Sequence, residues 1–321
     1  MASIEELKLL SILEVAGRLG MQLKRVGNQT YIWDEHESFT INSRDNYFNW
    51  FARSTGGDVI ALVQTVQEEL TGQEISFKQA KHFLEEGNFE VVNVTNVPEK
   101  EPFSYYLKPY ETKFIEGREY LKEIRGLSDE TIDFFGEKGV LAQATKKTKD
   151  YYEPVIVFKS LDRQNEVIGA SLQGIRENYD LYERGRLKQI MRASDGMTGM
   201  HIDIGTPKRL VFAEAPIDLM SYYELKKDTL KDVRLVAMDG LKESTISRHV
   251  AELLFEMGEI KGEIESATIP TFLANMAEVT TFFKEGKHQD LITLAVDNDK
   301  AGHTFIERLT DKKIAFVSDL P

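Results

Sequence analysis

Two aspartates follow an apolar run near the end of the chain, in the segment LITLAVDNDKAG. Residues 291–296 are apolar or β-branched, and Asp297 and Asp299 come soon after them. Because side chains alternate along a strand, both aspartates should point to the same side of the chain. Two such carboxylates repel each other unless a cation lies between them, and Mg²⁺ prefers carboxylates together with phosphate and water. Taken alone, the segment is also typical of a solvated turn.

A second acidic element lies upstream, in the segment RLVFAEAPIDLMSYYEL. Residues 210–213 form a continuous apolar run, which is typical of a buried parallel strand. Glu214 follows this strand, Pro216 suits the first position of a helix, and Asp218 falls in its first turn. Each acid has an ordinary alternative, since Asp218 can favour the helix dipole and Glu214 can be an edge residue without a role. Two elements with the same order of strand, acid and helix favour one shared metal site.

Further strands around these acids predict the fold class. Residues 234–240, RLVAMDG, indicate a strand that ends in a glycine turn, and residues 312–321, KKIAFVSDLP, indicate a fourth strand. Strands that alternate with helices are typical of a doubly wound parallel sheet with right-handed crossovers. We therefore expect an α/β protein whose acids lie at the carboxyl ends of parallel strands, where such sheets place their chemistry.

These segments resemble a known domain. The Glu214 and Asp218 pair, the Gly240-Leu241 turn and residues 297–302, DNDKAG, are similar to the Toprim domain of DnaG-type bacterial primases. That domain is a Rossmann-like parallel sheet, and topoisomerases and some nucleases share it. Ala215 and Asn298 stand where the primases have glycines, and both replacements are small or polar.

The resemblance assigns roles to the acids. It implies that the catalytic residues are Glu214, Asp297 and Asp299. It also implies that Mg²⁺ or Mn²⁺ is held by Glu214, Asp218, Asp297 and Asp299, in the two-metal manner of phosphoryl transfer.

The resemblance extends upstream of the expected Toprim core. Residues 154–174 indicate two strands around a polar turn, similar to the hairpin that opens the primase core. Residues 117–140 indicate a helical pair joined by an Arg-Gly-Leu-Ser turn, in which Ser128 is a good N-cap. Primases have the same arrangement ahead of their core.

The N-terminal part is similar in layout to a primase zinc ribbon, but it lacks the ligands. The chain contains no cysteine, and Trp33 and Trp50 stand where thiolates are expected. His36 matches the histidine ligand, but one histidine cannot hold a tetrahedral zinc. We therefore expect a small α+β domain of zinc-ribbon type without zinc, in which apolar side chains form the core and His36 is a hydrogen-bonded structural residue.

The expected domain plan follows from these segments. A chain of 321 residues is long for a single core. We expect a degenerate ribbon over residues 1–92, a linker over 93–112, the N-terminal part of a primase core over 113–205 and a Toprim domain over 206–321. Residues 241–290 are long enough to be an insertion near the site. Because primases carry a further acidic loop after their fourth strand, we expect a C-terminal truncation and a longer native protein.

Basic residues cluster just before the expected Toprim strand. The net charge of −13 argues against a general nucleic-acid coat protein. Local clusters can nevertheless bind phosphates without sequence information. The resemblance places the template groove beside residues 186–196, so we expect DNA contacts from Arg184, Arg186, Lys188 and Arg192. Arg176 and a second cluster, Lys146, Lys147 and Lys149, are further candidates, although charge runs are usually a solvated face.

Aromatic residues of the N-terminal part allow two interpretations. They could stack on the bases of single-stranded DNA, or they could fill the core of the ribbon without metal. These residues are Tyr47, Phe48, Trp50 and Phe51.

Composition limits the classes of protein to which the chain can belong. Apolar residues make up 41% of the chain, no apolar run approaches the length that spans a membrane, and no leader peptide is visible. The absence of cysteine excludes disulfides and suits a cytoplasmic protein with no membrane partner.

By resemblance, the chain belongs with the LtrC-like primases of conjugative plasmids and integrative elements. The implied activity is synthesis of short RNA primers on single-stranded DNA from nucleoside triphosphates, with a helicase or relaxase as a further partner. Two alternatives stay open: a Toprim nuclease that uses the same acids, and a non-catalytic protein that recruits replication or transfer proteins to single-stranded DNA.

Overall fold

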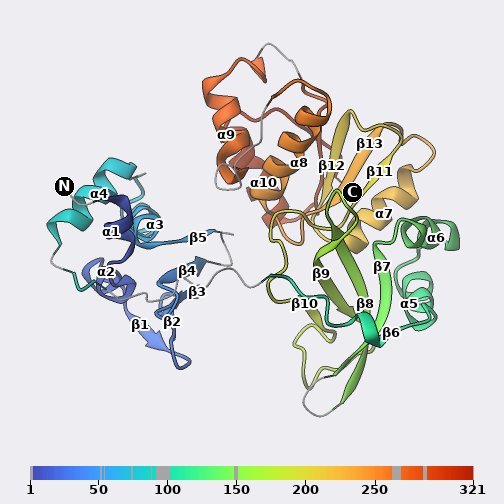
Figure 1. Ribbon diagram of the computed structural model, residues 1–321, viewed down its shortest axis with the longest axis horizontal. Helices are drawn as coiled ribbons and strands as arrows, with labels where there is room; N and C mark the ends of the chain where they lie inside the picture. Colours follow the sequence, from blue (N-terminus) through green and yellow to red (C-terminus); the bar gives the residue numbers. More distant parts are fainter. Residues whose placement is uncertain are drawn as a thin grey trace. The chain divides into compact units, whose positions relative to one another are not determined.

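The computed structural model divides the chain into two compact units, Met1–Glu101 and Pro102–Pro321 (Figure 1). It describes residues 3–50, 53, 55–73, 75–87, 89–91, 102–147, 151–261, 269–284 and 288–320. Residues 93–101 of the expected linker, together with Phe51 and Lys149, lie outside the described residues. Among the helices of the described part, none is both long and apolar enough to cross a membrane.

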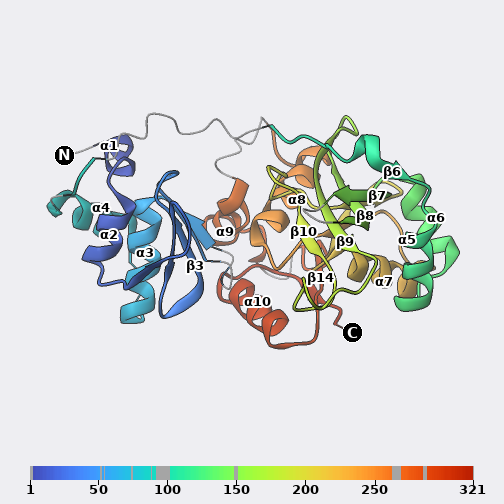
Figure 2. The same ribbon diagram turned by 90° about the horizontal axis from the view of Figure 1, so that it is seen from below.

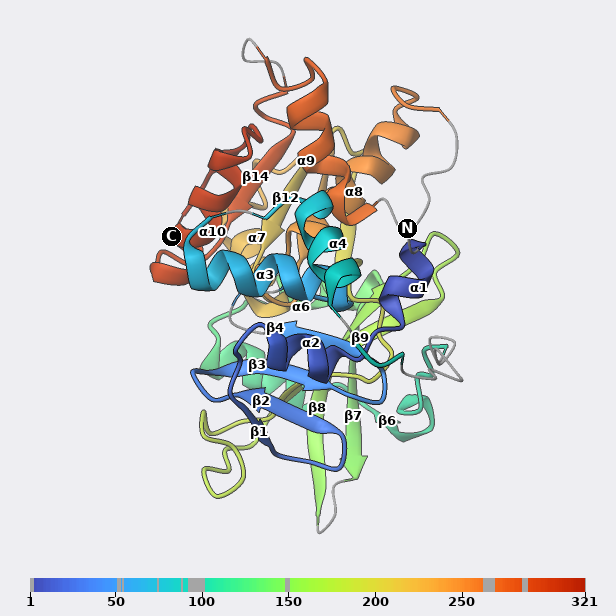
Figure 3. The same ribbon diagram turned by 90° about the vertical axis from the view of Figure 1, so that its left-hand side faces the viewer.

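The N-terminal unit is a five-stranded antiparallel sheet with helices packed against it (Figure 3). Hydrogen bonds from backbone amides to Ser11 and Asp58 cap the helices α2 and α3, whose apolar residues complete the core of this unit. Its elements are α1 (Ile4–Lys8), α2 (Ile12–Arg18), β1 (Leu23–Arg25), β2 (Thr30–Trp33), β3 (His36–Asn42), β4 (Tyr47–Trp50), β5 (Thr55–Gly57), α3 (Val59–Thr71) and α4 (Phe77–Glu86).

Aromatic rings pack together at the position where a primase zinc ribbon would hold its metal. Trp33 and Trp50 are buried, and their ring centroids are 6.0 Å apart. The His36 ring lies between them, 4.6 Å from Trp33 and 4.9 Å from Trp50, and its Nε2 is 3.3 Å from Glu69. Phe48 is fully buried, whereas Tyr47 is exposed. Phe48 and Trp50 are therefore core residues, and Tyr47 is the described aromatic of this group that solvent can reach.

The first half of the second unit forms an antiparallel sheet in the order β10-β9-β8-β7-β6. The hairpin expected over residues 154–174 is confirmed by β8 and β9, and β10 is the next neighbour along the edge (Figure 2). The strands are β6 (Glu111–Thr112), β7 (Leu141–Lys147), β8 (Tyr152–Leu161), β9 (Val167–Gly174) and β10 (Lys188–Ile190). The predicted helical pair is α5 (Glu116–Glu119), which continues as a π-helical turn over Tyr120–Ile124, and α6 (Asp129–Glu137).

The second half forms a mostly parallel sheet in the order β11-β13-β12-β14-β15. Strand β12 pairs in parallel with both β13 and β14, and β11 joins antiparallel at the edge. The elements are β11 (His201–Ile204), β12 (Arg209–Ala213), α7 (Pro216–Lys226), β13 (Val233–Ala237), α8 (Glu243–Glu256), α9 (Ile269–Val279), β14 (Ile292–Ala295), α10 (Lys300–Asp311) and β15 (Val317–Ser318).

The fourth parallel strand is much shorter than predicted. The apolar pattern predicts a strand over residues 312–321, but β15 covers only Val317–Ser318. Helix α10 runs to Asp311, and Lys313 then adopts a positive φ of 58°. This left-handed turn uses the first residues of the predicted strand to reverse the chain.

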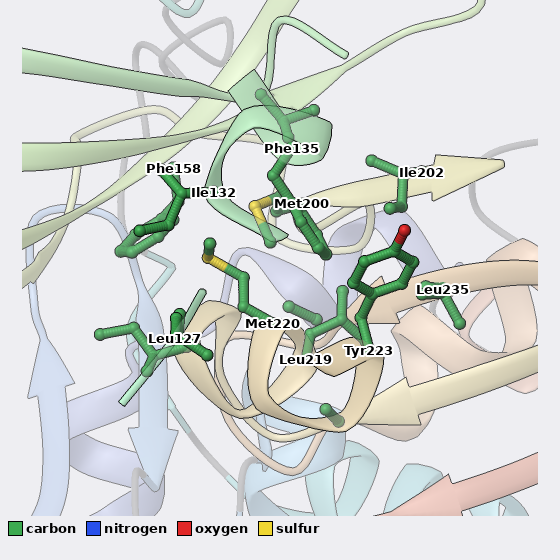
Figure 4. Packing of buried hydrophobic residues seen from close by; sticks show 14 of the residues in the cluster. Leu127, Ile132, Phe135, Phe158, Met200, Ile202, Leu219, Met220, Tyr223 and Leu235 are labelled. Atoms are coloured by element: carbon green, nitrogen blue, oxygen red, sulfur yellow. The ribbon is translucent and has the colours of Figure 1, made fainter. Parts of the chain in front are cut away.

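Helices cover both faces of the parallel sheet, which explains its continuous apolar strands. Val211 and Ala213 of β12 pack with α6 and α7, in the core shown in Figure 4. Leu210 and Phe212 point to the other face, where the apolar sides of α8, α9 and α10 cover them. Because both faces are buried, the sheet holds the ends of its strands in a fixed arrangement.

Two partly buried hydrogen bonds connect α7 to the start of α6. The carboxylate of Glu224 accepts hydrogen bonds from the Ser128 backbone amide at 3.0 Å and from the Ser128 hydroxyl at 2.7 Å. Partial burial would raise the pKa of Glu224, but the hydrogen bonds of Thr131 and Ser128 outweigh it and lower the pKa to about 2. Glu224 also lies 3.2 Å from the Lys227 ammonium.

Replacing Glu224 should make stability depend less on pH. The folded-state pKa lies below the ordinary value of 4.5, so the charge of Glu224 stabilises the fold above about pH 4.5 and the contribution is lost as pH falls toward 2. Glu224→Gln should lower the free energy of unfolding by about 1–2 kcal/mol at pH 7. Denaturant unfolding should show that the deficit shrinks with acidification. The exposed Glu123→Gln is the control, and an equal deficit at pH 7 and pH 3 would contradict the assignment.

The aromatic cluster leads to a prediction about zinc. With no cysteine in the chain and His36 packed between two tryptophans, four zinc ligands are not available at this position. Elemental analysis of the purified protein should find no stoichiometric zinc, and a strong chelator should leave the melting temperature unchanged. About one zinc per chain, or a melting temperature that falls on chelation, would overturn this view of the N-terminal unit.

Candidate active site

Three neighbouring parallel strands end at one edge of the sheet, and an acid follows each of them. In the register, Ala213 of β12 lies opposite Ala237 of β13 and Ala295 of β14. Glu214 directly follows β12, and Asp239 and Asp297 each come one position later after β13 and β14, at the same edge of the sheet. The sheet therefore brings together acids that are up to 83 residues apart in the sequence (297 − 214 = 83).

The turns after these strands are locked by backbone contacts. The amide of Gly240 donates to the carbonyl oxygen of Glu214 at 2.9 Å, which holds the turn after β13 beside the end of β12. At Gly302, an added Cβ would clash with the carbonyl oxygen of Asp297, so only glycine lets α10 begin this close to the end of β14. Asp299 caps α10 by accepting from the Gly302 amide at 2.8 Å.

The acids interact electrostatically. Burial raises the pKa of the Glu214 carboxyl, and the charges of Asp297, Asp218 and Asp299 raise this pKa further. Burial and the charge of Asp297 also raise the pKa of Asp218. The positive charge of Lys188 opposes both shifts. The four acids that the sequence singles out therefore form one region of negative charge, with Lys188 as a nearby cation.

This region is an open arrangement. Within the described part of the chain, no three His, Cys, Asp or Glu side chains form a group that could by itself hold a metal ion. One Asp218 oxygen accepts from the Ala215 amide at 3.1 Å. The donors are all carboxylate oxygens, which suits Mg²⁺ or Mn²⁺, ions that complete their coordination with phosphate and water. The residues thus fit a metal that arrives with a phosphate ligand.

A cavity of about 480 Å³ opens between the acids and the antiparallel sheet. Glu214, Asp218 and Asp239 are among the residues that line it. Basic residues line it as well, and they are Arg125, Arg184, Arg186 and Lys188. The cavity has the size of a small-molecule site and is lined by charges of both signs. Such an arrangement can bind a phosphate chain between a metal and fixed cations.

The structure brings only some of the expected basic residues to this cavity. Arg186 is held in place, since it donates to Glu177 at 2.8 Å and lies 5.2 Å from the centre of the Tyr120 ring. Arg192 is exposed and is not among the described residues that line the cavity. Arg176 pairs with Glu116 at 3.2 Å. Lys146 and Lys147 lie at the end of β7, away from the cavity lining.

Sequence reasoning missed Arg125 and Asp239. Arg125 belongs to the Arg-Gly-Leu-Ser turn that predicts the helical pair, but the turn alone did not show that its arginine lies on the cavity and opposes the rise in the pKa of Asp218. Asp239 ends the segment RLVAMDG, a third strand followed by an acid. The signal was the same one that marked Glu214 and Asp297, and it could have been found.

Comparison with known proteins gives two kinds of likeness, and no family model matches the chain. An uncharacterized protein of Bacillus anthracis is 29% identical over 309 residues, which cover 95% of this chain and 78% of that protein. Among solved structures, the primase fragment of the bacteriophage T7 primase-helicase is 13% identical with a TM-score of 0.35, and the aligned parts cover 88% of this chain and 84% of that one.

Two further structures show a similar level of likeness. The Aquifex aeolicus primase, with its zinc-binding and RNA polymerase domains, is 14% identical with a TM-score of 0.36 over 100% of this chain and 80% of that one. A bacteriophage T7 polymerase complex with primase domains is 16% identical, with a TM-score of 0.34 over 61% and 76% of the two chains. With TM-scores below 0.5, these likenesses do not assign a function to this chain.

Removing the charges of Asp297 and Asp299, the acids that follow β14, should distinguish a role in metal binding from a structural role. In the double variant Asp297→Asn with Asp299→Asn, two charges leave a repulsive group, and asparagine keeps the N-cap of α10. Thermal unfolding without metal should therefore occur at the same or a higher temperature. The stabilisation that Mn²⁺ gives to the wild type should be lost.

The matched control removes two exposed charges, by Asp290→Asn with Asp311→Asn, and should keep the response to Mn²⁺. Lower stability of the first variant with an unchanged response to Mn²⁺ would mean that Asp297 and Asp299 only support the helix start.

Proposed function

We propose that this chain is a DnaG-type primase, which makes short RNA primers on single-stranded DNA in a metal-dependent reaction. The observation that carries the proposal is the cavity that carboxylates and cations line together. A nucleotidyl transferase needs both, because its substrate is a nucleoside triphosphate and its reaction develops charge on phosphate oxygens. The motif resemblance of residues 214–218 and 297–302 to the primase Toprim domain supports the same conclusion.

The four acids and the cations have separate roles in this proposal. Glu214, Asp297 and Asp299, together with Asp218, hold Mg²⁺ or Mn²⁺, which supplies charge neutralisation at the phosphates and polarises the attacked phosphorus. Lys188 and Arg186, which line the same cavity, bind triphosphate oxygens. The contribution of these side chains is positioning and charge neutralisation.

The template is single-stranded DNA, which follows the basic side of the cavity. Arg184 is exposed at the cavity wall and Arg192 is exposed a few residues after β10, so both are accessible to a phosphate backbone. Such contacts give binding that weakens with salt and does not depend on sequence. The N-terminal unit, with Tyr47 accessible, is proposed to be a degenerate zinc-ribbon domain without zinc that acts on the template.

The wider setting is also a proposal. The 29% identical relative is uncharacterized, and the motifs resemble the LtrC-like primases of conjugative plasmids and integrative elements. A cytoplasmic role in replication or transfer of such an element, beside a helicase or relaxase, suits this resemblance. The parallel sheet β11–β15 would be the Toprim domain, and residues 113–205 the N-terminal part of the core. Within the range 241–290, α8 and α9 cover one face of that sheet.

A primer-synthesis assay tests the proposal. With labelled nucleoside triphosphates, single-stranded DNA and Mn²⁺ or Mg²⁺, the wild type should make short RNA products. Glu214→Gln should reduce the rate at least a hundredfold, because it removes a metal ligand. Lys188→Ala should reduce it about tenfold or more, mainly through a raised KM for nucleotides. Asp311→Asn, on the exposed end of α10, is the control and should be fully active.

The same assay separates the alternatives. Shortening of the DNA without incorporation, abolished by Glu214→Gln, would identify a nuclease and refute the primase proposal. DNA binding with neither incorporation nor cleavage would identify a non-catalytic accessory protein.

A further inference from the structure

A loop over residues 175–187 joins β9 to β10 at the edge of the antiparallel sheet (Figure 1). Its residues, all of which the structure describes, form no helix or strand. Two of the cations that line the cavity beside the acids, Arg184 and Arg186, belong to this loop. Long loops without secondary structure are uncommon in compact domains, and many of them are functional. The place of the two arginines at the cavity therefore depends on what holds the loop.

Hydrogen bonds within the loop fold it back on itself. The Asn178 amide donates to the carbonyl oxygen of Gly185 at 2.6 Å, and the Gly185 amide donates to that of Tyr182 at 2.7 Å. Gly185 has a positive φ of 76°, which glycine adopts readily. At the base of the loop, the Gly174 amide donates to the Leu187 carbonyl oxygen at 2.8 Å. The loop therefore has a defined internal shape, and its attachment to the sheet decides where that shape lies.

A buried carboxylate attaches the loop to the sheet. Glu153 of β8 is 2% exposed, and one of its oxygens accepts a hydrogen bond from the Tyr182 hydroxyl at 2.6 Å. The Tyr151 hydroxyl lies 2.7 Å from the same oxygen and 2.8 Å from the Tyr182 hydroxyl. An added Cβ at Gly174 would lie 2.7 Å from the other Glu153 oxygen, so the missing side chain lets the carboxylate reach the base of the loop. Burial and the hydrogen bond to Glu153 raise the pKa of Tyr182, which keeps this phenol protonated as a donor.

The position of Arg186 follows the position of the loop. Its Nε donates to the Ile175 carbonyl oxygen at 3.2 Å, and its Nη1 donates to Glu177 at 2.8 Å. Both partners belong to the loop, so the guanidinium moves with it. Arg184 lies between Tyr182 and Arg186 in the sequence and is exposed. The hydroxyl that reaches Glu153 is therefore four residues or fewer from each arginine.

Stability alone is a poor reason for a carboxylate at this position. Removing a carboxylate from water costs free energy, and apolar residues that replace buried charged groups of similar size are often neutral or stabilising. Here the carboxylate of Glu153 lies against two phenols, and one of them, Tyr182, belongs to the loop. A carboxylate provides what an apolar side chain does not, which is a directed hydrogen bond that fixes the loop at one place.

We propose that Glu153, acting through the Tyr182 hydroxyl, is a positioning residue that holds Arg184 and Arg186 at the cavity. The inference rests on the proposed function, in which Arg186 binds triphosphate oxygens and Arg184 is accessible to the template. Cations that are already fixed bind a phosphate more tightly than mobile ones, because they need not be ordered on binding. Loss of the attachment should therefore weaken nucleotide binding and leave the acids and their affinity for metal unchanged.

The test measures equilibrium binding of ATP to the full chain in the presence of Mg²⁺. Tyr182→Phe removes only the hydroxyl and should raise the Kd for ATP about tenfold. Tyr151→Phe is the matched control, because it removes a phenol from the same carboxylate oxygen but from outside the loop. This control should leave the Kd close to the wild-type value. Both variants should keep the stabilisation that Mn²⁺ gives to the wild type, since the four acids are untouched.

A double-mutant cycle separates positioning from a general loss of structure. In a chain that carries Arg184→Ala with Arg186→Ala, Tyr182→Phe should not weaken ATP binding further, because the groups that it positions are gone. Glu153→Leu removes the acceptor and should weaken ATP binding as Tyr182→Phe does. Glu153→Gln keeps an acceptor oxygen and should retain most of the affinity.

Each outcome decides the question. An unchanged Kd in Tyr182→Phe, with ATP still bound by the wild type, would overturn the positioning role and leave the proposed function standing. Equal losses in Tyr182→Phe and Tyr151→Phe would show a general effect on stability and would also overturn it. A further loss in the chain without Arg184 and Arg186 would have the same meaning. No binding of ATP by the wild type would remove the proposed function and the inference together.

Discussion

Repulsion among the carboxylates at the ends of β12 and β14 is the constraint on which the candidate site depends. The register of the parallel sheet brings Glu214 close to Asp297, and burial strengthens their interaction. A fold tolerates such a group only if the rest of the structure holds it in place. Here the apolar cores on both faces of the sheet and the glycine at position 302 provide that support. A cation at this place would relieve the repulsion, which is why we interpret the acids as a metal site.

The antiparallel sheet contributes positive charge to the cavity, and the parallel sheet contributes the carboxylates. Strand β10 is short and lies at the edge, and it carries Lys188 to the cavity that Glu214 also lines. Arg125 reaches the same cavity from the turn before α6. Because these cations and the acids come from different elements, their spacing is set by the packing of Phe158, Tyr120 and their neighbours. The protein thus forms a gap between fixed charges of opposite sign, into which a phosphate chain fits.

The sequence predicted the parts of the structure that depend on local pattern. The strands before Glu214 and Asp297, the β8–β9 hairpin and the helix capped by Ser128 are confirmed, because alternation, continuous apolar runs and caps are visible within ten residues or so. The length of β15 was wrong, since the turn at Lys313 depends on a positive φ that lysine does not signal.

Properties that depend on packing between distant segments were harder to predict. Arg125 and Arg192 look alike in the sequence. Of these two described arginines, Arg125 lines the cavity and Arg192 does not, because the fold brings the turn of Arg125 to the strand ends. The interaction of Ser171 with Asp239 is likewise visible only once β9 is placed beside the end of β13. The metal ligands, the domain limits and the absence of zinc stay predictions.

Coupling between metal and nucleotide tests the central claim most directly. Because the carboxylates form no complete metal cage among the described residues, Mn²⁺ should bind weakly alone and at least tenfold more tightly when ATP is present. By linkage, Mn²⁺ should raise the affinity for ATP by the same factor, and Glu214→Gln should abolish the coupling in both directions. Titration calorimetry of each ligand with and without the other measures this factor, provided that binding of Mn²⁺ to ATP in solution is subtracted. Affinities for ATP that do not change with Mn²⁺ would contradict a site shared by the acids and the cations.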